Sequence, residues 1–264
     1  MSYREKVVWI TGASEGIGLA LAEGFAEEGA KLILSARRAE ILKDACDSCL
    51  AKGASAAKYI AFDLYDDEAL DAACKEAVGV FKGIDVLILN AGISQRSFVA
   101  ETTIDTFDKI MKINYLSNVR ITTNLLENLL ERRVQIAVVS SLVGKFGSPY
   151  RSGYAASKHA LHGFYDSLRA EHTNALNICL ICPGFIKTNL SLHALKGDGQ
   201  ALNEMDDAQA KGMLAEDFAK KAIKGIRQGK AELYIGGKER FAIYLRRFFP
   251  GLFRKIISKA KVRW

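Results

Sequence analysis

A tyrosine and a lysine lie four positions apart, at Tyr154 and Lys158, in the run Tyr-Ala-Ala-Ser-Lys. In a helix this spacing puts both side chains on one face. A phenol has a pKa of about 10, so it needs a neighbouring cation to exchange protons at neutral pH, and the lysine ammonium could supply it. The pair is therefore a candidate proton-transfer site, although the same spacing is common by chance on helix surfaces.

Ser141 could add a hydroxyl to this pair, because it lies 13 residues before Tyr154 and follows the apolar run Ile136 to Val139. Such a run predicts a buried strand. Ligand sites of open α/β sheets gather at the carboxyl ends of their strands. The position of Ser141 therefore makes it a third candidate for the same site.

A glycine-rich segment follows the first apolar run. Residues 11 to 18 read Thr-Gly-Ala-Ser-Glu-Gly-Ile-Gly, and a stretch with helical spacing comes next. Glycines let the backbone turn tightly and approach a pyrophosphate, whose charge the amides and dipole of a helix N-terminus stabilise. Three glycines could equally form an ordinary strand-to-helix turn, but the first such turn is where an open parallel sheet binds its nucleotide. The segment therefore predicts a dinucleotide site.

The choice between NAD and NADP depends on the residues that end the second strand. An NAD site carries an acidic residue there, about 20 residues after the glycines, which holds the ribose 2′-hydroxyl. Arg37 and Arg38 occupy this place, and guanidinium groups offer charge-assisted hydrogen bonds to phosphate oxygens. The pair predicts NADP, although both could be solvated cations, and Glu15 would lie close to any bound phosphate.

The sequence pattern around these residues predicts an α/β fold of the Rossmann type. Stretches with helical spacing separate six Val-, Ile- and Leu-rich runs, at residues 7–10, 32–34, 59–62, 86–89, 136–139 and 178–181. Such runs predict strands buried on both faces of a parallel sheet. The alternation favours a doubly wound sheet flanked by helices, with right-handed crossovers. No repeat or Pro/Gly/Ser linker interrupts residues 1–264, so we expect a single domain.

Taken together and in this order, the motifs resemble the series found in the short-chain dehydrogenase/reductase family, over residues of about 6 to 190. The resemblance rests on Thr11 to Gly18, Asn90-Ala91-Gly92, Asn114, Ser141, Tyr154 with Lys158, and Pro183-Gly184 with Thr188. It implies an NADP-dependent oxidoreductase that moves a hydride between the nicotinamide and a carbonyl or alcohol carbon. The hard chemistry would belong to the cofactor.

The resemblance also implies a role for each matching catalytic residue. Tyr154 would pass the proton, and Lys158 would lower its pKa and hold the nicotinamide ribose. Ser141 would bind the substrate oxygen, and Asn114 would position a water that links Lys158 to solvent. The implied cofactor contacts are Gly12, Ser14, Gly16, Ile17, Gly18, Arg37, Arg38, Asp63, Leu64, Asn90, Ala91, Gly92, Tyr154, Lys158, Pro183, Gly184, Ile186 and Thr188.

The resemblance further implies a mobile lid over the substrate, at residues of about 184–215. This segment is rich in leucine, and Leu142, Val143 and Phe146 beside Ser141 add an apolar wall. An apolar pocket with few polar groups selects an apolar ligand. We therefore expect a lipid-, steroid- or retinoid-like carbonyl or alcohol, although the leucines could also form an ordinary small helix on the core.

The last segment, about residues 238–264, is basic. It carries nine Lys or Arg against Glu239, a net charge of +8 in a chain of +7, so the preceding residues sum to −1. If helical despite Pro250, its cations and apolar residues form an amphipathic segment. It resembles the C-terminal extension of 11β-hydroxysteroid-dehydrogenase-like members. The tail could contact a membrane surface, pack against a partner subunit or cover the substrate mouth.

The sequence argues against a secreted, a membrane-spanning and a metal-binding protein. The apolar run at the N-terminus is too short for a signal-peptide core or a spanning helix. Five cysteines fit reduced thiols better than a disulfide framework, so we expect a cytoplasmic protein. The cysteines and four histidines show no ligand spacing, so we expect no metal site.

The expected partners are a small apolar substrate and further copies of the chain. The resemblance implies a homodimer or homotetramer that pairs through helices of about 105–131 and 154–172. We do not expect the tail to bind nucleic acid, because the rest of the sequence shows no surface that combines aromatic and basic residues. The alternative function is a non-catalytic NADP-binding sensor or scaffold that acts through the tail, but the intact set of Ser141, Tyr154 and Lys158 argues against it.

Overall fold

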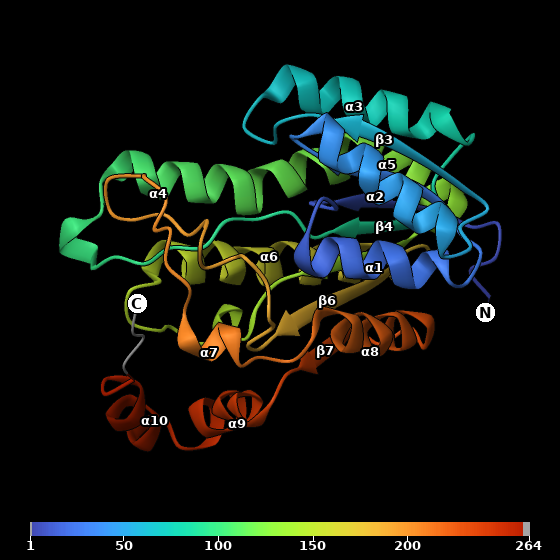
Figure 1. Ribbon diagram of the computed structural model, residues 1–264. Helices are drawn as coiled ribbons and strands as arrows, with labels where there is room; N and C mark the ends of the chain where they lie inside the picture. The colour runs from blue at the N-terminus through green and yellow to red at the C-terminus, as the bar shows by residue number, and fades with distance from the viewer. Residues whose placement is uncertain (1, 261–264) are drawn as a thin grey trace.

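The computed structural model describes residues 2–260 and has a parallel sheet at its centre (Figure 1). Within these residues seven strands pair in the order β3-β2-β1-β4-β5-β6-β7. The chain order reverses between β1 and β4, which is the point where an open sheet leaves a crevice at the carboxyl ends of its strands. The strands are β1 Val7–Thr11, β2 Lys31–Ala36, β3 Ala56–Ala61, β4 Val86–Leu89, β5 Gln135–Val139, β6 Asn177–Pro183 and β7 Glu232–Ile235.

Helices cover both faces of the sheet, as Figure 1 shows. Alternate residues of β1 serve the two faces: Val8 and Ile10 pack with α1, α2 and α8, whereas Val7 and Trp9 pack with α3, α5 and α6. This confirms the predicted doubly wound sheet. The helices are α1 Gly16–Ala26, α2 Ala39–Ala51, α3 Asp67–Val80, α4 Ile104–Met111, α5 Ser117–Arg132, α6 Ser152–Glu171, α7 Asp207–Ala210, α8 Ala215–Arg227, α9 Phe241–Phe248 and α10 Pro250–Ile257.

Two elements differ from the sequence prediction. Strand β7 was not predicted, because only alternate residues of this edge strand are buried and it gives no continuous apolar run. The helix expected over about 105–131 consists of α4 and α5, which a π-helical segment, Lys112–Leu116, joins. Such segments are frequent at functional sites, and this one carries the buried Asn114.

The basic tail forms two helices. Pro250 is the first residue of α10, because proline lacks an N–H and suits the start of a helix rather than its interior. Phe253 of α10 is buried in a cluster with Leu142, Val143 and Phe146. The tail therefore packs on the apolar wall beside Ser141. Residues 261–264, with the last cations of the predicted series, lie outside the described residues.

Candidate active site

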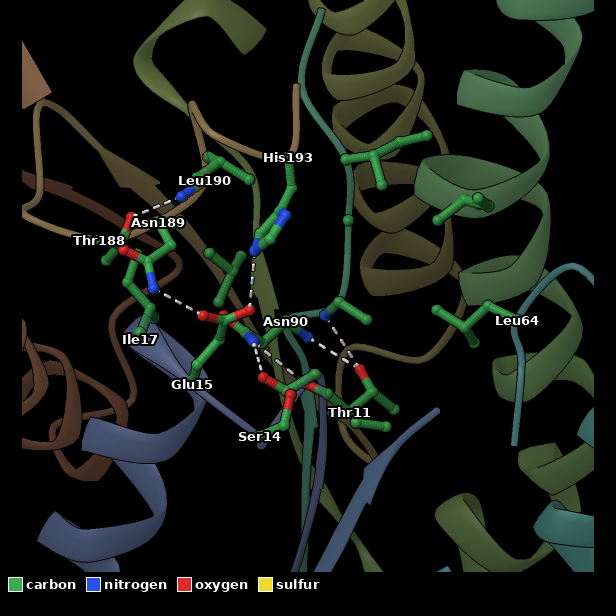
Figure 2. Close-up of a pocket in the computed structure, with 18 of the residues that line it drawn as sticks. Thr11, Ser14, Glu15, Ile17, Leu64, Asn90, Thr188, Asn189, Leu190 and His193 are labelled. Carbon is green, nitrogen blue, oxygen red and sulfur yellow. Dashed lines mark hydrogen bonds and ion pairs between the residues drawn. The ribbon is translucent and has the colours of Figure 1, made fainter. Parts of the chain in front are cut away.

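One cleft of about 370 Å³ opens at the carboxyl ends of the central strands (Figure 2). Of the predicted cofactor residues, only Gly18 is absent from its walls. Ser141, Tyr154 and Lys158 line the same cleft. The residues singled out by the motifs therefore come together around one continuous space.

The backbone of the glycine segment leaves no room for a Cβ at two of its glycines. Gly12 has a φ of +68°, and a Cβ there would lie 2.8 Å from the Cα of Ala91. A Cβ on Gly18 would lie 2.0 Å from the carbonyl oxygen of Gly12. Gly18 therefore lets helix α1 approach the turn closely, and the turn leaves backbone at the cleft where a pyrophosphate would fit.

Thr11 and Asn90 fix this turn to the end of β4 (Figure 2). The side-chain amide of Asn90 donates to the carbonyl oxygens of Thr11 and Gly12, both at 3.0 Å. The hydroxyl of Thr11 accepts from the backbone N–H groups of Asn90 and Ala91. Asn90 thus supports the cofactor side through the backbone of the glycine turn. Thr11 supports the same turn, a role that the sequence analysis did not predict.

Glu15 connects the arginine pair to the lid segment. Its Oε1 lies 3.3 Å from Nη2 of Arg38 and 3.3 Å from Nε2 of His193, and its Oε2 accepts a 2.9 Å hydrogen bond from Asn189 (Figure 2). Arg37 makes no ion pair with any residue of 2–260. Glu15 would therefore compete with a phosphate for Arg38 and leave Arg37 free. Its two partners in the lid, Asn189 and His193, were not predicted from the sequence.

Tyr154 lies on α6 and is 8% exposed. Burial raises the pKa of its phenol, while the hydrogen bond with Ser141 and the charges of Arg151 and Arg96 act in the opposite direction. The phenol is therefore protonated at neutral pH, which is the state of a proton donor. Ser141 also accepts a 3.3 Å hydrogen bond from the backbone N–H of Val143, which begins a short turn after β5.

Lys158 is buried on the same face of α6, and its Nζ lies 5.7 Å from the ring centre of Tyr154. The ammonium donates a 2.8 Å hydrogen bond to the carbonyl oxygen of Val139. Burial lowers its pKa to about 8. The cations that act on the phenol of Tyr154 are Arg151 and Arg96. The implied role of Lys158 in lowering the pKa of Tyr154 stays a prediction.

Asn114 lies behind the cleft and is fully buried. Its Oδ1 accepts from the N–H of Ile93, and its Nδ2 donates to the carbonyl oxygen of Ile93 and to the hydroxyl of Ser157. The side chain thus ties the π-helical segment to the loop after β4 and to α6. Its implied role in holding a water stays a prediction.

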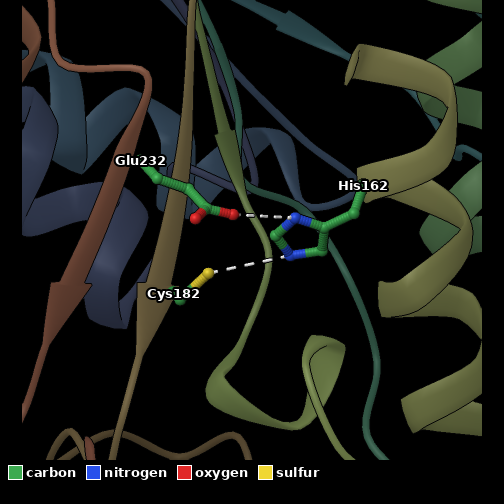
Figure 3. A group of neighbouring side chains, drawn as sticks. All are labelled: His162, Cys182 and Glu232. Carbon is green, nitrogen blue, oxygen red and sulfur yellow. Dashed lines mark hydrogen bonds and ion pairs between the residues drawn. The ribbon is translucent and has the colours of Figure 1, made fainter. Parts of the chain in front are cut away.

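Figure 3 shows a second group of neighbouring side chains, the buried His162 and Cys182 and the half-buried Glu232. Nδ1 of His162 lies 3.3 Å from Glu232, and Nε2 lies 3.7 Å from the sulfur of Cys182 and 3.0 Å from the hydroxyl of Ser140. One potential ligand atom from each of the three side chains lies within 4.8 Å of the other two, a juxtaposition that the sequence did not predict. The group links α6 to β6 and β7 behind Ser141.

Known proteins resemble this chain in sequence. The sequence profile of the short chain dehydrogenase family matches residues 6–197. The dehydrogenase/reductase SDR family protein 7-like of Drosophila melanogaster is 37% identical over 98% of this chain and 81% of its own length. The dehydrogenase/reductase SDR family member 7B of Xenopus laevis is 38% identical over 97% of this chain and 82% of its own length.

Solved structures share the fold at lower identity. An alcohol dehydrogenase of the archaeon Thermococcus sibiricus, complexed with 5-hydroxy-NADP, has a TM-score of 0.76 and 24% identity over 88% of this chain and 97% of its own. A short chain dehydrogenase/reductase of Burkholderia phymatum, in complex with NAD, has a TM-score of 0.84 and 22% identity over 96% of each chain. With the profile match and the relatives above, the chain belongs to the short-chain dehydrogenase/reductase family.

Proposed function

We propose that this protein is an NADP-dependent oxidoreductase that transfers a hydride between the nicotinamide and the carbonyl or secondary alcohol carbon of an apolar substrate. The observation that carries the proposal is one cleft lined both by Arg37 and Arg38 and by Ser141, Tyr154 and Lys158. A cofactor in this cleft would supply the hydride. Residues of this chain would bind the reactants and move the proton.

In the direction of reduction, Tyr154 donates its phenolic proton to the substrate oxygen, and the Ser141 hydroxyl hydrogen-bonds the same oxygen. Burial keeps the phenol protonated before the reaction. The buried guanidiniums of Arg151 and Arg96 then stabilise the phenolate that remains, because charges interact strongly in a poorly solvated site. Holding donor, acceptor and proton source together removes the entropy of encounter from the barrier.

The cofactor-binding residues divide by function. The turn at Gly12 and Gly16 and the start of α1 would receive the pyrophosphate. Arg37 and Arg38 would receive the 2′-phosphate, and this pair is our reason for proposing NADP rather than NAD. Ile186 and Thr188, which line the other side of the cleft, would hold the carboxamide.

The test is a panel of apolar ketones and aldehydes with NADPH or NADH, followed by the absorbance at 340 nm. We expect turnover with at least one member of the panel and a higher kcat/KM with NADPH. A protein that binds NADPH but reduces no member of the panel, and whose NADP⁺ complex oxidises none of the matching alcohols, would be the non-catalytic sensor instead.

Glu15→Gln should tighten the binding of NADPH roughly three- to fivefold. The substitution removes a partly exposed ion pair with Arg38, and such pairs are worth at most about 1 kcal/mol. The gain for NADH should be smaller, since NADH has no 2′-phosphate to bind the released guanidinium. Fluorescence titration with both cofactors measures the two dissociation constants.

Glu23→Gln is the matched control for this variant. Glu23 lies on α1, which Glu15 precedes. Glu23 pairs with Lys52, but it does not line the cofactor cleft. Its substitution should leave both dissociation constants unchanged. Equal gains for NADPH and NADH in Glu15→Gln would mean that Glu15 does not compete for the 2′-phosphate.

We also propose that the tail contacts an anionic lipid surface from the cytoplasmic side. No helix of the described residues is long and apolar enough to cross a membrane. The outer face of α9 and α10 exposes about half or more of six large apolar side chains, Phe241, Tyr244, Phe248, Phe249, Leu252 and Ile256. Six cations accompany them, at positions 240, 246, 247, 254, 255 and 259. This combination is typical of helices that lie in a membrane interface.

Vesicle flotation tests this contact. The protein should float with vesicles that contain phosphatidylserine and much less with vesicles of phosphatidylcholine alone. The double variant Phe248→Ser, Phe249→Ser should remain in the pellet. Leu50→Ser is the control, because Leu50 is 45% exposed but lies on α2, outside both the tail and the proposed subunit interface. Unchanged flotation of the double variant would contradict the contact.

The assembly we propose is a homodimer or homotetramer that pairs through the long α4–α5 unit and α6. Exposed apolar residues on this unit, Ile104 at 71% and Leu116 at 49%, favour a partner surface. Light scattering should therefore give a mass of two or four times 29.0 kDa. A monomer at micromolar concentration would contradict this assembly.

A further inference from the structure

A buried cluster of three charges lies beside Tyr154. Arg96 lies in the loop after β4, Arg151 precedes α6, and Asp206 is the residue before α7 in the lid segment. One oxygen of Asp206, Oδ2, accepts a hydrogen bond from each arginine, both at 3.1 Å. The side chains of Arg96, Arg151 and Asp206 are 4%, 11% and 7% exposed. Three distant segments thus converge on one carboxylate.

The cluster has a net charge of +1, because two arginines face one aspartate. The second nitrogen of Arg96, Nη1, donates to the neutral Ser94 hydroxyl and Gln95 carbonyl. Within residues 2–260 neither arginine pairs with a second carboxylate. Burial lowers the pKa of Arg151 to about 10, so its guanidinium is still charged at neutral pH. Burying an uncompensated charge is costly, which suggests that this charge has a partner from outside the chain.

Arg151 also has a donor without an acceptor. Its Nε is buried and makes no hydrogen bond, and buried donors in proteins are nearly always paired. The guanidinium lies over the ring of Phe185, 5.9 Å from its centre. Phe185 directly follows Gly184, which lines the cofactor cleft. The unpaired donor therefore belongs to a side chain that packs on Phe185, at the start of the lid segment.

The backbone ties the cluster to the catalytic tyrosine. Gln95, the neighbour of Arg96, accepts hydrogen bonds from the N–H groups of Gly153 and Tyr154 at 2.7 and 3.3 Å. Arg151 lies one turn of chain before Tyr154, and both guanidinium charges act on the phenol. A negative group bound to the arginines would therefore lie close to the oxygen that Tyr154 protonates.

We propose that Arg96 and Arg151 bind an anionic group of the substrate, a carboxylate or a phosphate monoester, near the carbonyl that is reduced, while Asp206 holds the lid against the same arginines. Guanidinium groups match both anions in shape and charge. The inference rests on the proposed function and narrows its substrate class: the apolar wall takes a hydrocarbon part, and the arginine pair takes an acidic group.

Three aldehydes with the same reacting group test the proposal: 4-formylbenzoate, 4-formylphenyl phosphate and methyl 4-formylbenzoate. Calorimetric titration of the protein with NADPH present gives their binding, and absorbance at 340 nm gives their reduction. The wild-type protein should bind at least one of the two anions at least tenfold more tightly than the neutral ester. The ratio between the two anions tells carboxylate from phosphate recognition.

Substitutions in the cluster should change this preference in a defined way. Arg151→Gln leaves Arg96 and Asp206 as a one-to-one pair, so the preference for the anion should fall to about one. Arg151→Lys keeps the charge and should retain part of it. Thermal unfolding confirms that each variant is folded. A purely structural role of the cluster would instead lower the melting temperature and leave the relative affinities for ester and anion unchanged.

The binding measurement separates failure of this inference from failure of the proposed function. Tyr154→Phe should lose turnover and keep the preference for the anion in binding. A protein that prefers the anion in binding but reduces no member of the ketone and aldehyde panel and oxidises none of the matching alcohols would keep the arginine site and overturn the proposed activity. Equal binding of ester and anions by the wild-type protein, or a preference that survives in folded Arg151→Gln, would overturn the arginine site.

Discussion

Replacing Tyr154 with phenylalanine should lower the kcat for carbonyl reduction roughly 10²- to 10⁴-fold, the usual contribution of a general acid. Among the described residues that line the cleft, Tyr154 has the one phenol. The ring packs with Leu142 and Val143, and phenylalanine keeps these contacts. The dissociation constant for NADPH should therefore change little. Steady-state rates at 340 nm and a cofactor titration measure the two effects.

Tyr165→Phe is the matched control. Tyr165 is also buried on α6, and its hydroxyl contacts Thr122 at 2.8 Å and donates to the carbonyl oxygen of Asn118. Removing this hydroxyl should lower the free energy of unfolding by about 1 kcal/mol and leave kcat unchanged. If Tyr154→Phe turned over within about threefold of the parent, Tyr154 would not be the acid.

The sheet was predictable from sequence where burial is complete. Strands β1, β4 and β5 have every residue buried, so their runs are continuous and apolar. Strand β7 lies at the edge, where Glu232 and Tyr234 alternate with buried residues, and four such residues give no clear pattern. The π-helical segment around Asn114 was equally invisible, because one extra residue in a turn barely disturbs the helical spacing on either side.

The residues that line the cleft were predictable where the signal is local in the sequence. A glycine turn between a strand and a helix fixes its own backbone, and Gly12 or Gly18 can be recognised from neighbours in sequence. The charges around Tyr154 offer no such signal, since Asp206 meets Arg96 across 110 positions. Helical spacing placed Lys158 on the correct face, but it could not tell that the ammonium would bond to the carbonyl of Val139.

Replacing Lys158 with methionine should stabilise the cofactor-free protein while lowering kcat roughly 10²-fold, because the ammonium that would hold the nicotinamide ribose in place is lost. Burial lowers the pKa of this lysine from 10.5 to about 8, and one pKa unit corresponds to about 1.4 kcal/mol. The buried ammonium thus costs about 3 kcal/mol at pH 7. Losing its hydrogen bond to Val139 takes back about 1 kcal/mol. The free energy of unfolding, measured in urea, should rise by about 2 kcal/mol.

The pH dependence of this gain identifies its cause. Between about pH 8 and 10.5 the unfolded chain holds the Lys158 proton and the folded chain does not, so wild-type stability gains from this residue as the pH rises. The advantage of Lys158→Met should therefore be constant below about pH 8 and disappear toward pH 10.5. A difference that stays the same from pH 7 to 10.5 would show that burial does not penalise the ammonium. If the difference in free energy of unfolding between the variant and the parent disappears as expected, the Lys158 ammonium destabilises the fold. Active-site residues often lower stability in this way.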